Sequence, residues 1–221
     1  MSICEFENYH GFYVPKEGAT KGVIVVQEWW GLNDNIKDLA RQVADRGFHA
    51  IAPDLYHGKT AKTVDEASHL MTGLDWDDAL NMIGAAARFL KANGALKATY
   101  QQNGVVGYCM GGAVSIAAAA RVPEIDAAAP FYGIPPASIA DPATIRIPLQ
   151  LHFGAKDEVP MSSPKAVEKL EETLKSSNVE YELHIYDAGH AFMNKTRPEA
   201  YHQASAELAF ERVITFFTQK L

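Results

Sequence analysis

The chain has 221 residues, a formal net charge of −7 and an isoelectric point near 5.6. This acidic balance argues against a nucleic-acid-binding surface, which requires a basic face. No apolar run is long enough to span a bilayer, so no membrane partner is predicted. The length suits one α/β domain, residues 1–221, with a substantial core.

The cysteine content and the N-terminal segment set the expected compartment. Residues 1–7 lack a basic stretch followed by an apolar one, so we expect no secretory signal. The only cysteines are Cys4 and Cys109, which makes a disulfide framework unlikely and favours a reducing, cytoplasmic location. There is no C-x-x-C pair and no H-E-x-x-H, so neither a metal nor another cofactor is predicted.

Along the chain, short apolar runs rich in β-branched residues alternate with amphipathic stretches of 12 to 20 residues. A weaker signal near 7–14 indicates an N-terminal strand or hairpin. The predicted strands are 22–27, 49–53, 103–108, 127–132, 148–153 and 181–186, and the predicted helices are 35–46, 76–93, 111–121, 164–176 and 198–218. This alternation predicts a mostly parallel central sheet with helices on both faces. The polar stretch 56–75 could form a helical flap over a site.

The most informative motif is Gly107-Tyr108-Cys109-Met110-Gly111, which stands between a predicted strand and a predicted helix. A G-x-S-x-G pentapeptide in this context is the nucleophile elbow of the α/β-hydrolase fold, and here a thiol replaces the hydroxyl. The elbow places the sulfur of Cys109 near a helix N-terminus, which favours the nucleophilic thiolate. The alternative is that Cys109 is a small buried hydrophobic residue.

Other candidate residues follow further strands, where ligands of parallel sheets gather. Glu28 follows the first predicted strand, Asp157 the fifth and His190 the sixth. The order of nucleophile, acid and histidine is that of the α/β-hydrolases. Asp187, three residues before His190, is a rival for the acid, although an aspartate so close is more often a turn residue. Glu28 could instead be a surface carboxylate on a loop.

Five segments together resemble the dienelactone hydrolases, also called carboxymethylenebutenolidases, along essentially the whole chain. They are Gln27-Glu28-Trp29-Trp30-Gly31-Leu32, residues 52–56 (APDLY), 107–112 (GYCMGG), 154–157 (GAKD) and 189–192 (GHAF). The resemblance implies that Cys109 is the nucleophile, His190 the base and Asp157 the acid that orients it. Glu28 then corresponds to the family's additional carboxylate, which contacts the thiol in the resting enzyme.

This chemistry needs donors for the oxyanion that forms as the thioester is made. We expect two backbone N–H groups to supply them, that of Met110 after the nucleophile and that of Trp29 after the first strand. The substrate pocket is predicted to include Trp30, shortly after one predicted strand, and Tyr132, at the end of another, together with Phe192 and Asn194. His152, inside a buried strand, is interpreted as a core histidine, His202 as a residue of a solvent-facing helix, and Cys4 as inert.

The sequence departs from the family where substrate is bound. The dienelactone hydrolases hold a substrate carboxylate with two arginines, one before the elbow and one four residues after the histidine. Here the second position is Asn194, and residues 56–87 contain no arginine, only the cations or histidines Lys59, Lys62, His57 and His69. Lysine and asparagine do not replace a planar guanidinium. Arg197 could substitute, but the adjacent Pro198 suggests a helix start that points elsewhere.

The leading functional hypothesis is therefore a cysteine hydrolase that opens small lactones or cleaves small esters. A general short-chain carboxylesterase or thioesterase is the alternative within enzymes. A non-catalytic binding module on a hydrolase scaffold is the alternative from another class. The sequence does not predict the oligomeric state.

Overall fold

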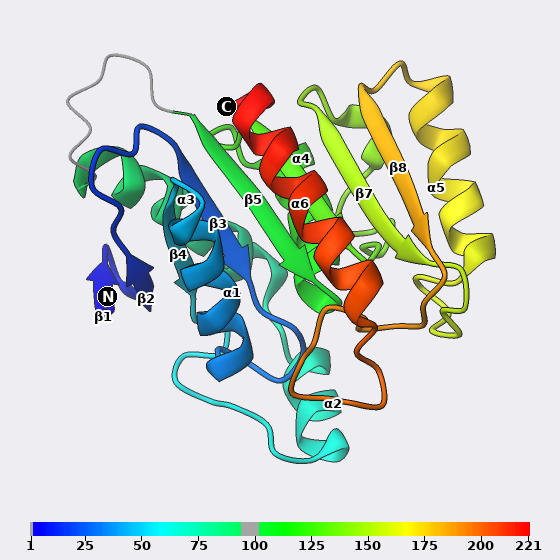
Figure 1. Cartoon of the computed structure of the whole chain (residues 1–221), viewed down its shortest axis with the longest axis horizontal. Helices are drawn as coiled ribbons and strands as arrows, with labels where there is room; N and C mark the ends of the chain where they lie inside the picture. Colours follow the sequence, from blue (N-terminus) through cyan, green and yellow to red (C-terminus); the bar gives the residue numbers. More distant parts are fainter. Residues whose placement is uncertain (1, 94–101) are drawn as a thin grey trace.

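The computed structural model describes residues 2–93 and 102–221, and within them one sheet of eight strands runs through the molecule (Figure 1). The strand order is β1-β2-β4-β3-β5-β6-β7-β8. The bounds are β1 (Ser2–Phe6), β2 (Tyr9–Val14), β3 (Gly22–Val26), β4 (His49–Pro53), β5 (Asn103–Tyr108), β6 (Ala127–Phe131), β7 (Leu149–Gly154) and β8 (Tyr181–Tyr186). The strands from β4 to β8 in this order are parallel, while β1 and β2 form an antiparallel hairpin. The predicted mostly parallel sheet is confirmed, and the hairpin begins at Ser2.

Helices cover both faces of the sheet, as predicted (Figure 1). The helices α1 (Asp34–Asp45) and α6 (Gln203–Lys220) lie in front of the sheet in this view, and α3 (Trp76–Asn93) and α4 (Met110–Arg121) lie behind it. The helix α5 (Pro164–Ser176) contacts the short 3₁₀ turn η1 (Pro142–Thr144), which also contacts α4. Because both faces are covered, every residue of β3 to β7 is buried, and most residues of these strands are apolar.

The first helix shows how local sequence fixes an element of this frame. Asn33 begins α1 by accepting a hydrogen bond from the Ile36 backbone N–H onto Oδ1 at 3.2 Å. Ile36, Leu39, Ala40 and Val43 then recur at helical spacing and are buried against β2, β3 and β4. This apolar stripe holds α1 on the sheet.

The last helix begins five residues later than predicted, at Gln203 rather than Pro198. Before it, the backbone N–H groups of Ala200 and Tyr201 both donate to the Arg197 carbonyl at 2.9 Å, which closes a turn. The buried stripe of α6 starts only at Ser205 and Ala206, and none of the residues 198–202 is fully buried. His202 is the exposed residue that precedes the helix, not part of a helical face.

His152 in β7 is a core histidine, as predicted. Its ring nitrogens are hydrogen-bonded to the Tyr186 hydroxyl at 2.8 Å and to Gln150 Oε1 at 3.0 Å, and it stacks on Phe131. Burial and nearby cationic groups hold the pKa of His152 well below its usual range. Cys4 lies on β1, at the opposite edge of the sheet from β8.

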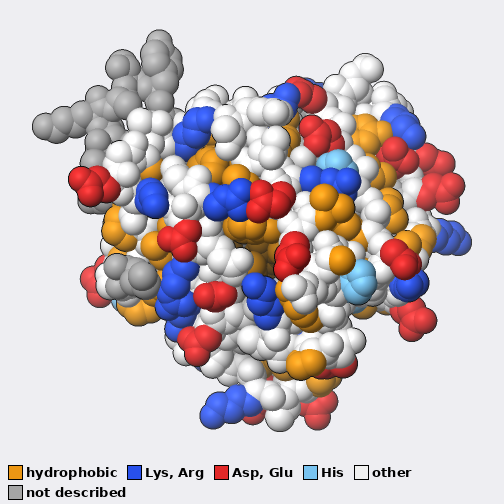
Figure 2. Space-filling model, viewed as in Figure 1, with side chains coloured by type: hydrophobic (Ala, Val, Ile, Leu, Met, Phe, Trp, Pro, Cys, Tyr) orange, Lys and Arg blue, Asp and Glu red, His pale blue; other side chains and the backbone are white. Residues whose placement is uncertain are grey.

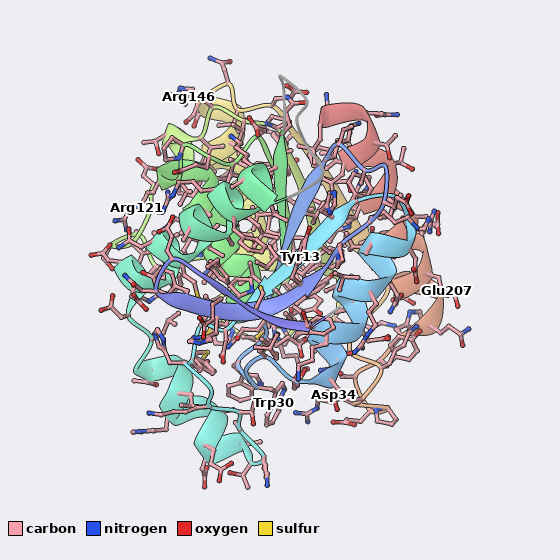
Figure 3. All side chains as sticks on the ribbon, turned by 90° about the vertical axis from the view of Figure 1, so that its left-hand side faces the viewer. Tyr13, Trp30, Asp34, Arg121, Arg146 and Glu207 are labelled. Carbon is pink, nitrogen blue, oxygen red and sulfur yellow. The ribbon has the colours of Figure 1, made fainter. Side chains whose placement is uncertain are left out.

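The two ends of the sheet differ in what they carry. Trp30, which follows β3, lies at the end from which α2 (Val64–Thr72) projects, whereas Arg146, which precedes β7, lies at the opposite end (Figure 3). The carboxyl ends of the parallel strands are therefore the end with α2. On the face in Figure 2, acidic and basic side chains are interspersed. One such pair, Arg46 of α1 with Glu211 of α6, is bridged by two hydrogen bonds of 2.5 Å.

A very close approach between two elements occurs where β5 meets α4. A Cβ atom on Gly107 would lie 2.0 Å from the Gly111 carbonyl oxygen and 2.4 Å from Ser115 Oγ. The obstacle is backbone of the following helix, so no side-chain rotation relieves it. Glycine at position 107 is therefore what allows the strand to turn directly into the helix.

We predict that Gly107→Ala lowers the free energy of unfolding by about 1–3 kcal/mol or more, the cost of overpacking against a rigid neighbour. Gly73→Ala is the matched control, because Gly73 has an ordinary φ of −86° and its nearest obstacle to a Cβ is 3.4 Å away. Its change should stay within about 0.5 kcal/mol. Urea denaturation of both variants measures the difference, and equal losses would contradict this account of the elbow.

Candidate active site

Cys109 occupies the turn between β5 and α4 and directly precedes the first residue of that helix. Its backbone has φ +56° and ψ −116°, a conformation that non-glycine residues rarely adopt. The Cys109 N–H donates to the Phe131 carbonyl at 3.1 Å, and its carbonyl accepts from Gly112 at 2.9 Å and Ala113 at 3.2 Å. These bonds hold the turn in place. The side chain is only partly buried, so the reading of Cys109 as a fully buried hydrophobic residue is wrong.

A chain of hydrogen bonds joins Cys109 to a buried carboxylate through His190. The His190 Nε2 atom lies 3.2 Å from Cys109 Sγ, and its Nδ1 atom lies 2.7 Å from Asp157 Oδ2. Asp157 follows β7, its side chain has no exposed area, and its Oδ1 atom accepts the Val159 N–H at 2.9 Å. The rival Asp187 is exposed and forms an ion pair with Lys156 at 2.7 Å. Asp157 is therefore the carboxylate that contacts His190.

The electrostatic surroundings of His190 favour its protonated form. Burial opposes the charged ring, but the hydrogen bonds to Asp157 and Cys109 outweigh it and raise the pKa of His190 to about 10. The protonated ring faces the sulfur of Cys109 through Nε2. The Ser162 hydroxyl, fully buried, lies 3.3 Å from Nδ1 of the same ring and was not anticipated from the sequence.

Glu28 is buried, with 2% of its surface exposed, so its interpretation as a surface carboxylate is wrong. Asn194 Nδ2 donates to its Oε2 at 2.5 Å, and the Tyr132 hydroxyl donates to its Oε1 at 3.3 Å. Burial raises the pKa of Glu28 to about 7, while these bonds and the neighbouring cations act in the opposite direction. The expected contact of Glu28 with the thiol is replaced here by that of His190 with the thiol.

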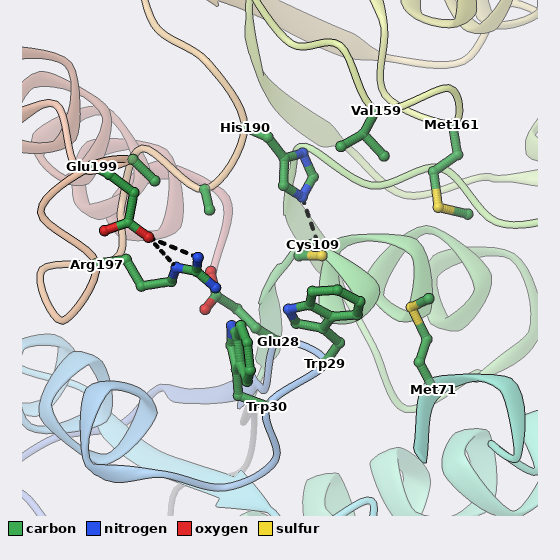
Figure 4. A pocket seen from close by; sticks show the side chains of 12 residues that line it. Glu28, Trp29, Trp30, Met71, Cys109, Val159, Met161, His190, Arg197 and Glu199 are labelled. Carbon is green, nitrogen blue, oxygen red and sulfur yellow. Dashed lines mark hydrogen bonds and ion pairs between the residues drawn. The ribbon is translucent and has the colours of Figure 1, made fainter. Parts of the chain in front are cut away.

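The sulfur opens into a cavity of about 310 Å³ at the carboxyl end of the sheet (Figure 4). Most of its lining is apolar, and the charged groups in it are few. The lining residues are Glu28, Trp29, Trp30, Met71, Cys109, Val159, Met161, His190, Ala191, Arg197, Glu199 and Ala200. Met71 belongs to α2, so the predicted helical flap does supply a wall of the cavity.

Of the four predicted pocket residues, Trp30 lines the cavity and the other three lie beneath it. Tyr132 is fully buried, with its ring 5.0 Å from the His190 ring in an edge-on arrangement. Phe192 is fully buried against Tyr132, and Asn194 is fully buried against Glu28. The φ of Tyr132 is +35°, which directs the chain into the turn after β6. These three buried side chains therefore pack against His190, against each other or against Glu28, and do not line the cavity.

Arg197 and Glu199 border the cavity, which the sequence analysis did not predict for either residue. The Arg197 guanidinium lies 4.9 Å from the centre of the Trp30 ring and forms an ion pair with Glu199 at 2.7 Å (Figure 4). The expectation that Arg197 points elsewhere assumed a helix start at Pro198, and the turn found there returns Arg197 to the site instead.

The described residues, 2–93 and 102–221, contain no group of three or more His, Cys, Asp or Glu side chains arranged to hold a metal ion. In the same part of the chain, no helix combines the length and apolar character needed to cross a membrane.

The two predicted oxyanion donors lie near the nucleophile. Met110 begins α4, directly after Cys109, and Trp29 follows β3, the strand next to β5.

Comparisons with known proteins identify the family of this chain. The model of the dienelactone hydrolase family matches residues 9–221. The chain is 35% identical to Protein usf of Aquifex pyrophilus, over 99% of this chain and 98% of that protein. It is 32% identical to an Escherichia coli K12 protein named provisionally as a carboxymethylenebutenolidase, over 96% of this chain and 81% of that protein.

A solved structure from Klebsiella pneumoniae, named provisionally as a dienelactone hydrolase, superimposes with a TM-score of 0.85 at 26% identity. The superposition covers 99% of this chain and 98% of that one. With an α/β-hydrolase sheet, an elbow that carries Cys109 and a family match over nearly its whole length, the chain belongs to the dienelactone hydrolase family.

Proposed function

We propose that this protein hydrolyses small, uncharged lactones or carboxylic esters through a thioester on Cys109. The observation that carries the proposal is the continuous path from Cys109 Sγ to His190 at 3.2 Å and on to Asp157 at 2.7 Å, beside an apolar cavity. It combines a nucleophile, a base and a group that orients the base.

In the first half of the reaction, the Cys109 thiolate attacks the carbonyl carbon and a C–S bond forms. The carbonyl oxygen becomes an oxyanion, for which the backbone N–H groups of Met110 and Trp29 are the donors. Collapse of this intermediate breaks the C–O bond of the ester. The leaving alkoxide takes the proton from His190 Nε2, and Asp157 keeps the ring oriented through Nδ1.

In the second half, water hydrolyses the thioester. His190, now neutral, accepts a proton from the water as its oxygen attacks the acyl carbon. A second oxyanion forms at the same two backbone donors. The C–S bond then breaks, the carboxylic acid leaves, and the thiolate is again paired with protonated His190. A lactone follows the same steps, but its alkoxide stays attached to the acyl group and the product is a hydroxy acid.

The cavity supports an uncharged substrate more than an anionic one. Arg197 is the arginine that borders it, and its charge is already shared with Glu199 and with the Trp30 ring. The Asn194 side chain, at the family's second arginine position, is buried on Glu28 and not in the cavity wall. The same observations favour a general short-chain carboxylesterase or thioesterase as the second candidate. The intact path from Cys109 to Asp157 argues against a purely non-catalytic binding module.

We predict that Cys109→Ala abolishes hydrolysis of p-nitrophenyl acetate and leaves the fold intact, because the thiol faces a cavity and is not part of the packed core. Steady-state turnover and a thermal melt by circular dichroism are the measurements. Turnover close to that of the wild type would reject the thioester mechanism.

A second prediction separates the two aspartates. Asp157→Asn should lower kcat by about 10⁴-fold, the loss seen when a triad acid becomes an amide and the histidine tautomer is no longer fixed. Asp187→Asn is the control, because Asp187 is exposed and contacts Lys156 on the surface. It should change kcat by less than about twofold, since an exposed ion pair contributes little. The reverse ranking in steady-state kinetics would identify Asp187 as the acid.

A third prediction concerns substrate charge. The wild-type enzyme should show little difference in kcat/KM between an anionic dienelactone and a neutral lactone of the same size. Glu199→Gln releases Arg197 from its ion pair and should raise the preference for the anion by about tenfold, the value of one charge-assisted hydrogen bond. A strong wild-type preference for the anion would show that Arg197 binds a carboxylate despite Glu199.

A further inference from the structure

Both oxygens of the buried Glu28 carboxylate are engaged by donors from outside its own loop. Asn194, in the turn that follows His190, donates to Oε2, and Tyr132, after β6, donates to Oε1. In Figure 4 the carboxylate is turned toward Arg197 and away from Cys109. Glu28 and Cys109 nevertheless line the same cavity, so the orientation of this one side chain decides which group the thiol meets.

The orientation of the Asn194 amide is itself fixed. Its Oδ1 atom accepts the Thr196 backbone N–H at 3.0 Å and the Thr196 hydroxyl at 2.7 Å. A backbone N–H can only donate, so the amide oxygen must face Thr196 and the amide nitrogen must face Glu28. The amide nitrogen can only donate, so it binds the carboxyl group of Glu28 whether that group is ionised or protonated. Thr196, Asn194 and Glu28 form a directed chain of hydrogen bonds that ends at a carboxylate in the lining of the cavity that also holds the thiol.

The remaining groups around Glu28 come from four other segments. Tyr108 ends β5, Tyr132 follows β6, and His190 and Arg197 belong to the segment after β8, while Cys109 directly precedes α4. Burial raises the pKa of Glu28 to about 7 and the two cations act against this shift, while the buried tyrosines stay neutral because burial raises their pKa values. A carboxylate in this setting opposes a thiolate if it turns toward Cys109, because like charges repel and a thiol donates to it.

We propose that Asn194 and Thr196 are positioning residues that hold the Glu28 carboxylate away from Cys109, so that the thiol is paired with His190 before any substrate binds. The inference rests on the proposed thiol chemistry. In this arrangement the free enzyme is ready to attack, with no need for a charged substrate to displace Glu28. This fits a cavity whose arginine is already paired with Glu199.

The test is alkylation of Cys109 by iodoacetamide in the absence of substrate, followed over pH in a Cys4→Ser background. The parent should react rapidly at neutral pH, since His190 Nε2 lies 3.2 Å from the sulfur and can accept its proton. Asn194→Ala frees Glu28 to accept from the thiol, and the alkylation rate at pH 7 should fall by about tenfold, with the pH profile moved about one unit upward. Asn81→Ala, exposed on α3, is the control and should keep the parent profile.

Three further variants separate positioning from simple packing. Glu28→Gln combined with Asn194→Ala removes the charge that opposes the thiolate, so thiol reactivity should return to within about twofold of the parent. Thr196→Val loses the hydroxyl but keeps the backbone donor, so it should shift the profile in the same direction by less, and Thr196→Ser should restore it. If Asn194→Ala does not fold, Thr196→Val and Thr196→Ser test the positioning role in its place.

An unchanged alkylation profile in folded Asn194→Ala, or in Thr196→Val where only that pair can be measured, would overturn the inference. The inference would also be overturned if Asn194→Ala slows alkylation of Cys109 and the added Glu28→Gln change does not restore the rate, because the effect would then not act through Glu28. Esterase turnover of Cys109→Ala is measured alongside. Turnover that survives this change rejects the proposed function, whereas its loss together with an unchanged profile in the Asn194 variant rejects only the role of Asn194 and Thr196.

Discussion

The close approach of β5 to α4 is the constraint on which the site depends. Glycine at position 107 lets the backbone of the helix lie against the strand, and the single residue that joins them is forced to a positive φ. That residue is Cys109, and its side chain is thereby lifted out of the core toward the carboxyl end of the sheet. The loops after β7 and β8 end at the same edge, so Asp157 and His190 reach the sulfur without any long connection.

The two buried carboxylates of the site, Asp157 and Glu28, are each held by hydrogen-bond donors. Asp157 has no exposed side-chain area, yet it accepts from His190 and from the Val159 N–H. Glu28 is equally enclosed and accepts from Asn194 and Tyr132. Buried ionisable groups are costly unless they are hydrogen-bonded. These hydrogen bonds offset the cost of burial, and those of His190 with Asp157 and Cys109 raise the pKa of that histidine next to the thiol.

The sequence predicted the parts of the site that follow from regular alternation. Cys109, Asp157 and His190 were located because each follows a strand, and the sheet brings strand ends together whatever the details of the loops. The contacts of Glu28, Asn194 and Arg197 could not be read in this way. They depend on a turn after His190, where Pro198 had suggested the start of a helix. They also depend on a positive φ at Tyr132, which places its ring next to that of His190. Such features arise from long-range packing rather than local pattern.

The position of the two cysteines in the sheet has a consequence for redox chemistry. Cys4 is on β1 and Cys109 follows β5, four strands away in the sheet order, a separation of about 20 Å at the usual strand spacing. A disulfide needs Cα atoms within about 7 Å, so Cys4 cannot act as a resolving thiol for Cys109. A sulfenic acid formed at the elbow has no internal route back to the thiol and depends on a small external thiol that fits the cavity.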